Sequence, residues 1–576
     1  MFTKPTIVPI FQNLLVIILI SSLLAGCQQA PLVTYEADQS EYYEGAAVVT
    51  GHPLASDVGK DILAQGGNAV DAAVAVQLAL AVVYPRAGNI GGGGFMVYRA
   101  ADGTVDALDY REKAPARASR DMYLDSIGDP IKGLSTKGHL AAGVPGTVAG
   151  LVEAHERYGS LPWAALVQPA IDLAREGYTI SETESVRLNR YQEDIANYND
   201  ETCPFVKVDW ATGDLLQQTD LAATLERIRD QKRAGFYEGE TAAFIVQEMQ
   251  SGGGFISAED LANYQASWRE PVVGTYDNYR IISMPPSSSG GVALLQMLGM
   301  VEEYPLHEYG FQSTAATHLM VEAERRAYAD RAEYLGDSDY YPVPIDSLID
   351  KAYLQNRMAD FSAEQASASD SLAAGDFTNT KESFETTHTS IIDKDGNAVS
   401  LTTTLNSNYG CKVVVDGAGF FLNNEMDDFS IKPGTPNQFG LVGAEANAIA
   451  PGKRMLSSMT PSIIERDGEL FLVLGAPGGS TIITAVYQVF INVAEFGMPL
   501  DSAVWAPRFH HQWLPDQIWV EPTALGETVK EELTAMGHGF RDVNRMAVIK
   551  AILCTEDGRY HAVGDFRNPD DDVSGY

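Results

Sequence analysis

Residues 386–406 read TTHTSIIDKDGNAVSLTTTLN and predict two antiparallel strands, Thr386–Ile392 and Ala398–Leu405, joined by a short turn. Both flanking runs are rich in β-branched residues, which suit strands, and the Asp, Gly and Asn between them favour a turn. If Ile392 lies opposite Ala398, the register places Thr404 opposite Thr386, and opposed residues project to the same face of a sheet. A four-residue turn would shift that register. The sequence thus predicts two threonine hydroxyls close together at one end of the strand pair.

The chain just before this hairpin is composed of small and polar residues. Residues 362–380 are dominated by Ser, Ala, Gly, Asp and Thr, the composition of an exposed, weakly packed stretch that tolerates cleavage. On pattern alone the threonines belong to an ordinary half-buried strand. A cut between Glu385 and Thr386 would change this, because it frees an α-amino group with a pKa of roughly 7.7–8.0. That amine can take the proton of its own hydroxyl and turn Thr386 into a nucleophile.

A glycine turn follows a second predicted strand. Residues 474–480 read LGAPGGS, after the apolar run Leu470–Leu474. Consecutive glycines let backbone N–H groups approach a ligand closely, which is how an oxyanion hole for acyl transfer is built. Gly478 and Gly479 are therefore candidate oxyanion donors. The alternative is a tight turn that only packs against a neighbour.

Several scattered polar residues are of the types that recognise an amino acid. An arginine and hydroxyls suit its carboxylate, and carboxylates or amides suit its ammonium group. No spacing rule links them, and each alone is more typical of structural polarity. The candidates are Arg111, Asn406, Glu425, Asp428, Ser457 and Ser458.

The N-terminal half is predicted to be mainly helical. Two helices are expected between Asp57 and Tyr84, the first ending at Gly66-Gly67 and the second capped by Asn68. Glycines break the pattern at 88–94, and residues 150–265 are again mostly helical. Helices early and strands late favour helices packed outside central sheets.

Composition excludes some functions. The 576 residues carry 40 Lys and Arg against 77 Asp and Glu, a formal charge of −37, and nucleic-acid binding needs an excess of cations. No His/Cys cluster has metal-ligand spacing, and the adjacent His510-His511 pair is expected to be structural. We therefore expect no nucleic-acid partner, no metal and no cofactor.

The first residues predict export. Lys4, an apolar run and Leu24-Ala25-Gly26-Cys27 describe a signal peptide whose end resembles the bacterial lipobox. Residues 1–26 would be removed, Cys27 would carry the lipid, and 27–45 would form an acidic tether. Gln28, in place of Asp, resembles lipoproteins sent to the outer membrane. The expected location is the periplasmic face of that membrane, held by the lipid anchor only. A plain signal peptide or an anchor helix is the alternative.

Motifs spread along the mature sequence resemble those of γ-glutamyltransferases. They occur in the same order and span nearly all of the chain. The matching stretches are Pro85–Phe95, Asp109–Glu112, Val144–Gly150, Met284–Gly291, Tyr328–Arg331, Thr386–His388, Leu422–Phe429, Ser457–Pro461, Pro477–Gly479 and Ala506–Arg508.

The resemblance implies an α+β fold, the four-layer αββα sandwich of N-terminal-nucleophile hydrolases. The proenzyme would cut itself at Glu385–Thr386 into a large subunit, 46–385, and a small catalytic subunit, 386–576, which stay together. Thr386 would be both the cutting residue and the nucleophile, and Thr404 would hydrogen-bond it. By the same resemblance Gly478 and Gly479 supply oxyanion donors, Arg111, Ser457 and Ser458 hold the substrate α-carboxylate, and Asn406, Glu425 and Asp428 hold its ammonium.

The implied activity is cleavage of glutathione and other γ-glutamyl compounds, with transfer to water or to an amino-acid or dipeptide acceptor. Pro433–Lys453 resembles a lid loop, in which Phe439 stands where many relatives carry Tyr. Losing that hydroxyl removes one hydrogen bond from a closed lid. The alternatives are a glutaryl-cephalosporin acylase of the same fold and a non-catalytic amino-acid-binding surface lipoprotein.

Overall fold

The computed structural model describes residues 1, 35–372, 386–438 and 440–576. Three predicted functional residues lie outside these ranges, namely Cys27, Glu385 and Phe439. Among the described residues no helix is both long and apolar enough to cross a membrane.

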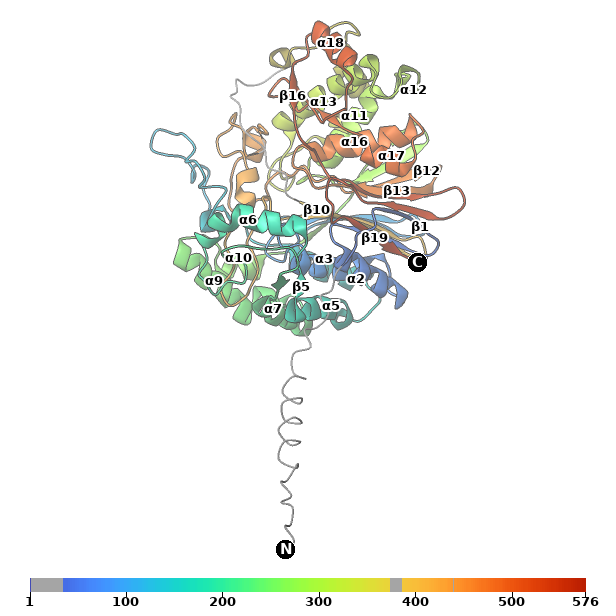
Figure 1. Cartoon of the computed structure of the whole chain (residues 1–576). Helices are drawn as coiled ribbons and strands as arrows, with labels where there is room; N and C mark the ends of the chain where they lie inside the picture. The colour runs from blue at the N-terminus through green and yellow to red at the C-terminus, as the bar shows by residue number, and fades with distance from the viewer. Residues whose placement is uncertain (2–34, 373–385, 439) are drawn as a thin grey trace.

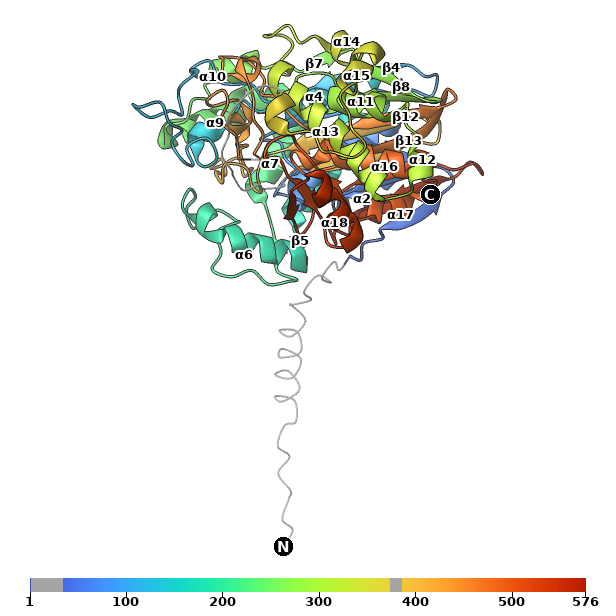
Figure 2. The same ribbon diagram turned by 90° about the horizontal axis from the view of Figure 1, so that it is seen from above.

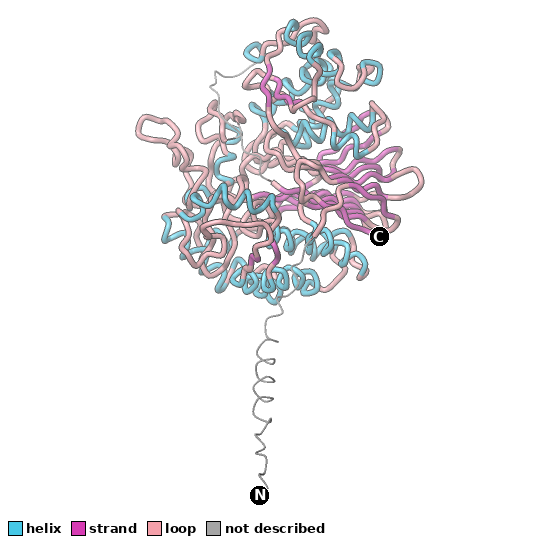
Figure 3. Tube along the Cα trace, in the orientation of Figure 1, coloured by secondary structure: helices cyan, strands magenta, loops and turns pink. Residues whose placement is uncertain are grey.

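Two seven-stranded antiparallel sheets are stacked face to face, with helices on both outer faces (Figures 1 and 3). The first, called the β10 sheet, has the order β19 (Asp572–Gly575), β2 (Ala47–Thr50), β10 (Thr387–Ile392), β11 (Ala398–Thr404), β3 (Gly93–Arg99), β4 (Val105–Asp109) and β7 (Ser267–Arg269). The second, called the β13 sheet, has the order β1 (Ser40–Tyr43), β18 (Tyr560–Val563), β17 (Lys550–Cys554), β13 (Glu469–Gly475), β12 (Ser462–Arg466), β9 (Tyr279–Ser283) and β8 (Val272–Tyr276). This is the predicted αββα sandwich.

The helices divide between the two outer faces. The β10 sheet is covered by α2 (Pro53–Ala64), α3 (Ala69–Val83) and α4 (Thr147–Tyr158), with α5 (Trp163–Glu176) packed on α3 and α7 (Thr219–Gln231) packed on α5. The β13 sheet is covered by α11 (Gly290–Val301), α16 (Thr481–Ala494) and α17 (Leu500–Trp505), with α13 (Thr314–Tyr334) packed on α11 (Figures 1 and 2).

The remaining elements are shorter or lie at the periphery. The helices are α6 (Glu182–Ala196), α8 (Ala234–Tyr237), α9 (Gly239–Gly252), α10 (Ala258–Asn263), α12 (Leu306–Tyr309), α14 (Ile345–Leu348), α15 (Lys351–Arg357) and α18 (Glu527–Met536). The 3-10 turns are η1 (His139–Ala141), η2 (Ser369–Leu372), η3 (Glu425–Asp428) and η4 (Glu445–Asn447). The small strands are β5 (Tyr178–Thr179), β6 (Leu215–Leu216), β14 (Phe509–His510), β15 (Ile518–Val520) and β16 (Phe540–Asp542).

The predicted helix pair near the N-terminus is confirmed, although the first helix begins at Pro53 rather than near Asp57. Asn68 caps α3 in a capping box with Asp71, as expected. All of α3 is buried, because it packs both on the β10 sheet and on neighbouring helices. An apolar helix with no polar stripe requires this position.

The central hairpin has the predicted register. Ile392 pairs with Ala398 and Thr387 with Thr403, so one further step along the chain brings Thr386 opposite Thr404. The turn is held by the buried Asp393 carboxylate, which accepts the backbone N–H groups of Asp395 and Asn397. Since β10 and β11 lie between β2 and β3, residues on both sides of the predicted cut share one sheet.

Candidate active site

Most of the predicted site residues line one pocket with about 360 Å³ of empty space. It lies where the ends of β10 and β11 meet the loops after β4, β11 and β13. Eight predicted residues line it, namely Thr386, Thr404, Gly479, Arg111, Asn406, Asp428, Ser457 and Ser458. Of the other described candidates, Gly478 lies in the turn beside Gly479, and Glu425 contacts Arg111. Residues more than 300 positions apart in the chain are therefore brought to one place.

Thr386 stands immediately before β10 and is 6% exposed, with its position opposite Thr404 set by the hairpin register. The Thr404 hydroxyl accepts a hydrogen bond from the backbone N–H of Asn406 at 2.7 Å. Asn406 has φ +73°, a left-handed conformation that Asn tolerates better than most residues, and its side chain donates to the Asn424 carbonyl at 3.0 Å. The predicted hydrogen bond between Thr404 and Thr386 stays a prediction.

The glycine turn lies between β13 and the first turn of α16. Gly478 has φ +150° and Gly479 φ +56°, both in the region that favours glycine. Thr481 fixes the turn, since its hydroxyl donates to the Gly478 carbonyl and accepts the Ala547 amide. Neither glycine N–H donates to another described group. Two uncommitted N–H groups at the start of a 14-residue helix suit a developing negative charge.

Arg111 lies just after β4 and is surrounded by carboxylates. Its two terminal nitrogens contact Glu425 at 2.7 Å and Asp428 at 2.5 Å, and its Nε donates to the Met455 carbonyl. Glu112 lies 3.6 Å away. Burial alone would lower the pKa of Arg111, but Glu425 and Asp428 outweigh it and raise that pKa. The guanidinium therefore stays charged.

The carboxyl groups of Glu112 and Glu425 have hydrogen-bond acceptor capacity left. Burial raises the pKa of Glu112 to about 8 and the pKa of Glu425 well above its ordinary value, each partly offset by Arg111. No oxygen of either glutamate accepts a hydrogen bond of good geometry from a described donor. Asp428 is the carboxyl group of this cluster that lines the pocket, and a carboxylate there suits a ligand ammonium.

Comparison with known proteins decides the family. The family model for gamma-glutamyltranspeptidase matches residues 55–575. The chain belongs to the γ-glutamyltranspeptidase family. It is 45% identical over 559 residues to the glutathione hydrolase proenzyme of Escherichia coli (strain K12), covering 96% of each chain. It is also 38% identical to the acylase ACY 1 proenzyme of Pseudomonas sp. (strain V22), covering 85% of this chain and 86% of the relative.

The fold comparison agrees with the observed layers. The cephalosporin acylase from Bacillus halodurans has a TM-score of 0.81 at 26% identity, and the match covers 96% of this chain and 99% of the acylase. The αββα architecture of this chain is thus shared with a cephalosporin acylase over nearly the whole length of both chains.

The side chains of Ser457 and Ser458 line the pocket and carry hydroxyl groups that can donate hydrogen bonds. The Ser457 hydroxyl accepts the Met459 amide N–H, and the Ser458 hydroxyl accepts a guanidinium N–H of Arg331 at 3.2 Å. Each of these two hydroxyl oxygens accepts a hydrogen bond from the protein, and each hydroxyl hydrogen remains available to donate to a ligand. Arg331 lines the pocket but was given no role from the sequence. The Tyr328–Arg331 motif of the family resemblance could have pointed to it. Sequence pattern alone does not separate a ligand-binding arginine on a helix from one with a structural role.

The predicted lid loop contacts the pocket through residues on either side of Phe439. Asn437 and Leu441 line the pocket, and Asn437 donates to Asp428 at 3.4 Å. The backbone N–H of Gln438 donates a hydrogen bond to the Asp427 carboxylate. How residue 439 itself affects closure stays a prediction.

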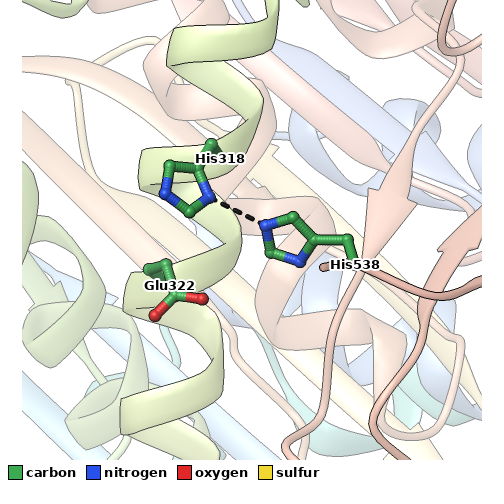
Figure 4. Close-up of side chains that lie close together, drawn as sticks. All are labelled: His318, Glu322 and His538. Carbon is green, nitrogen blue, oxygen red and sulfur yellow. Dashed lines mark hydrogen bonds between the residues drawn. The ribbon is translucent and has the colours of Figure 1, made fainter. Parts of the chain in front are cut away.

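One group of described residues offers potential metal ligands, His318, Glu322 and His538 (Figure 4). His318 Nδ1 and His538 Nε2 are hydrogen-bonded to each other at 2.7 Å, so these two nitrogens face one another instead of a shared ion. The carboxylate of Glu322 is paired with Arg325 and Arg326. The arrangement favours a structural network that links α13 to the chain just after α18.

Proposed function

We propose that the protein is a glutathione hydrolase and γ-glutamyltransferase whose nucleophile is Thr386. The observation that carries the proposal is the single pocket in which Thr386, the glycine turn and the Arg111 cluster meet. A nucleophile, oxyanion donors and a zwitterion-binding cluster are the three parts that transfer of a γ-glutamyl group requires. The 45% identity with a glutathione hydrolase proenzyme over nearly the whole chain supports it.

Maturation begins with attack of the Thr386 hydroxyl on the carbonyl carbon of Glu385. The C–N bond breaks as the C–O bond forms, so the acyl group moves from nitrogen to oxygen and the amine of Thr386 takes the proton. Water then hydrolyses the ester, releasing the Glu385 carboxylate and restoring the hydroxyl. The product is a two-subunit enzyme with a free amine on its nucleophile.

Turnover uses the same hydroxyl on a γ-glutamyl amide. The α-amine of Thr386 accepts the hydroxyl proton as oxygen attacks the γ-carbonyl, and Gly478 and Gly479 donate to the developing oxyanion. The proton passes to the leaving nitrogen, which departs as an amine and leaves a γ-glutamyl ester on Thr386. Water gives glutamate, whereas an amino acid or dipeptide gives a new γ-glutamyl amide.

The acceptor-rich cluster separates this proposal from the acylase alternative. A glutaryl group has no ammonium, and binding it would leave Asp428 and Glu425 with Arg111 as a partner but without a ligand donor. Leaving buried polar groups unpaired is what makes a site reject an analogue. We expect hydrolysis of γ-glutamyl-p-nitroanilide to exceed that of glutaryl-p-nitroanilide at least about 100-fold in kcat/KM, and a reversed preference would favour the acylase.

Two measurements test the nucleophile. The intact-mass spectrum of protein lacking residues 1–27 should contain one species ending at Glu385 and one starting at Thr386. The Thr386→Ala variant should stay a single chain without activity. A variant that still splits and turns over substrate would refute this assignment.

We also propose export as a lipoprotein, with Cys27 as the lipid-bearing residue. The support is the Leu-Ala-Gly-Cys motif after an apolar run. Full-length protein should label with radioactive palmitate and fractionate with the outer membrane, and Cys27→Ser should abolish the label. Equal labelling of both proteins would disprove the anchor.

A further inference from the structure

Asn437 is a polar residue of the catalytic pocket for which the sequence predicted no role. It belongs to the predicted lid loop, Pro433–Lys453, and lines the pocket together with Leu441. Its side-chain Nδ2 donates a hydrogen bond to Asp428 Oδ1 at 3.4 Å. Since Asp428 is a candidate ligand of the substrate ammonium, Asn437 contacts the recognition site without being one of its predicted members.

The direction of the Asn437 amide is fixed by its own turn. Its Oδ1 accepts the backbone N–H of Leu441 at 3.2 Å, and the backbone N–H of Asn437 donates to the Leu441 carbonyl at 3.0 Å. Because Oδ1 holds this N–H, Nδ2 is the end of the amide that faces Asp428. The reverse orientation would place two acceptor oxygens against each other and leave the Leu441 N–H without this acceptor.

The Asp428 carboxylate is held on both of its oxygens. Arg111 donates to Oδ2 at 2.5 Å, and Asn437 donates to Oδ1. The Asp428 side chain is 12% exposed, whereas those of Glu112 and Glu425 are fully buried. A carboxylate oxygen can accept more than one hydrogen bond, so Asp428 can hold Asn437 and a ligand ammonium at the same time. The orientation of this carboxylate therefore bears directly on an ammonium in the pocket.

A neighbouring carboxylate anchors the same stretch of chain. Asp427 accepts the backbone N–H of Gln438 at 3.0 Å, and its other oxygen accepts the Ser135 hydroxyl at 2.6 Å. Asp427 and Asp428 are consecutive residues of η3, and they bind the consecutive residues Asn437 and Gln438. The contact between Asn437 and Asp428 thus does not depend on one long hydrogen bond alone.

We propose that Asn437 is a positioning residue for recognition of the substrate ammonium, which it serves by holding the Asp428 carboxylate in its binding orientation. This rests on the proposed γ-glutamyl function and adds a residue to the same site. Because the hydrogen bond is long, we expect its loss to cost as much as that of an ordinary neutral hydrogen bond, about 3- to 12-fold in kcat/KM.

The test compares γ-glutamyl-p-nitroanilide with glutaryl-p-nitroanilide, which differ only in the α-amino group. Asn437→Ala should lower kcat/KM about 3- to 12-fold on the first, through KM, with kcat within about twofold of wild type. On the glutaryl anilide, which has no ammonium to bind, kcat/KM should change less than about twofold. Equal losses on both anilides, or no loss on the first, would overturn the proposal.

A double variant tests whether Asn437 acts through Asp428. In an Asp428→Asn background the carboxylate charge is gone, so Asn437→Ala should cost less than about twofold more on the γ-glutamyl anilide. A loss as large as that of Asn437→Ala alone would mean that Asn437 acts independently of Asp428, which would refute a positioning role.

The matched control is Gln438→Ala, at the next position of the same turn. The Gln438 side chain accepts the Ser407 hydroxyl at 2.9 Å instead of binding Asp428. Gln438→Ala should therefore change kcat/KM on both anilides by the same factor. A loss confined to the γ-glutamyl anilide would assign the effect to the turn as a whole and count against Asn437.

Intact mass reports folding and maturation of each variant through the split. If Asn437→Ala fails to split, the two anilides are compared on Asn437→Ser, whose hydroxyl suits a turn but is too short to reach Asp428. A ratio of the two rates equal to wild type would then overturn the proposal. Wild-type protein inactive on γ-glutamyl-p-nitroanilide would instead refute the proposed function, whereas active wild type with an unaffected Asn437→Ala refutes only the role of Asn437.

Discussion

Replacing Gly478 by Ala should damage the oxyanion turn much more than a similar replacement elsewhere in the same sheet. A Cβ at Gly478 would lie 2.5 Å from the Ala547 Cβ and 2.6 Å from the Ala547 Cα, and the residue has φ +150°. Overpacking costs about 1–3 kcal/mol and a left-handed backbone about 1–3 kcal/mol. The expected loss of unfolding free energy is therefore about 2–6 kcal/mol.

The loss of activity should be larger than the loss of stability suggests. Relief of the clash moves the turn, and removing one oxyanion donor costs about 100- to 1000-fold in kcat. The assays are urea unfolding, intact mass for the split, and kcat of the matured fraction on γ-glutamyl-p-nitroanilide. The kinetic comparison with wild type uses only Gly478→Ala protein that has split into two chains.

The matched control is Gly468→Ala in the turn between β12 and β13. Gly468 has φ +88°, yet no atom lies within 4 Å of the position of an added Cβ. Gly468→Ala should lower the unfolding free energy by about 1–3 kcal/mol from backbone strain alone and leave kcat within about twofold of wild type. Adding Ala547→Gly to Gly478→Ala should recover only part of the loss, because the main chain at position 547 would still crowd the new methyl group. Equal effects of both glycine variants on kcat would refute this account of the turn.

Three further outcomes are expected. Asp428→Asn should raise KM for γ-glutamyl-p-nitroanilide about 10- to 100-fold with a smaller change for the glutaryl anilide, because one ammonium acceptor loses its charge; equal changes in steady-state kinetics would contradict this. Asp393→Ala should lower the unfolding free energy by about 2–4 kcal/mol in urea titrations, because its carboxylate accepts hydrogen bonds from Ala69, Asp395 and Asn397; a loss under about 1 kcal/mol would be too small. Burial lowers the pKa of His538 to about 3, so as pH drops from 6.5 toward 3 the unfolded chain takes up the proton before the folded chain does, and stability falls. His538→Gln should therefore make the urea midpoint depend less on pH over this range. An unchanged slope of urea midpoint against pH would refute this prediction.

The hairpin register is predictable from sequence because the composition of its turn limits where the strands can pair. Placing Ile392 opposite Ala398 is enough to align Thr386 with Thr404, and the two strands do pair in this way. The outer ends each differ by one residue from the prediction, since β10 begins at Thr387 instead of Thr386 and β11 ends at Thr404 instead of Leu405. The order of helices and strands favoured outer helices around central sheets, but the four-layer sandwich followed only from the family resemblance, because pattern does not say which strands of a long chain pair.

The polar residues of the pocket show the limit of sequence reasoning. Residue type suggested Arg111 as the carboxylate ligand, but type does not reveal that its guanidinium already contacts Glu425 and Asp428. Arg331 has the opposite property, a charge without a carboxylate partner among the described residues, and that also depends on distances across the fold. Electrostatic balance in a buried site is set by neighbours from distant segments. For this reason residue type alone does not show how the two arginines that line the pocket divide its recognition of a ligand, and substrates lacking either end of the zwitterion should separate their roles.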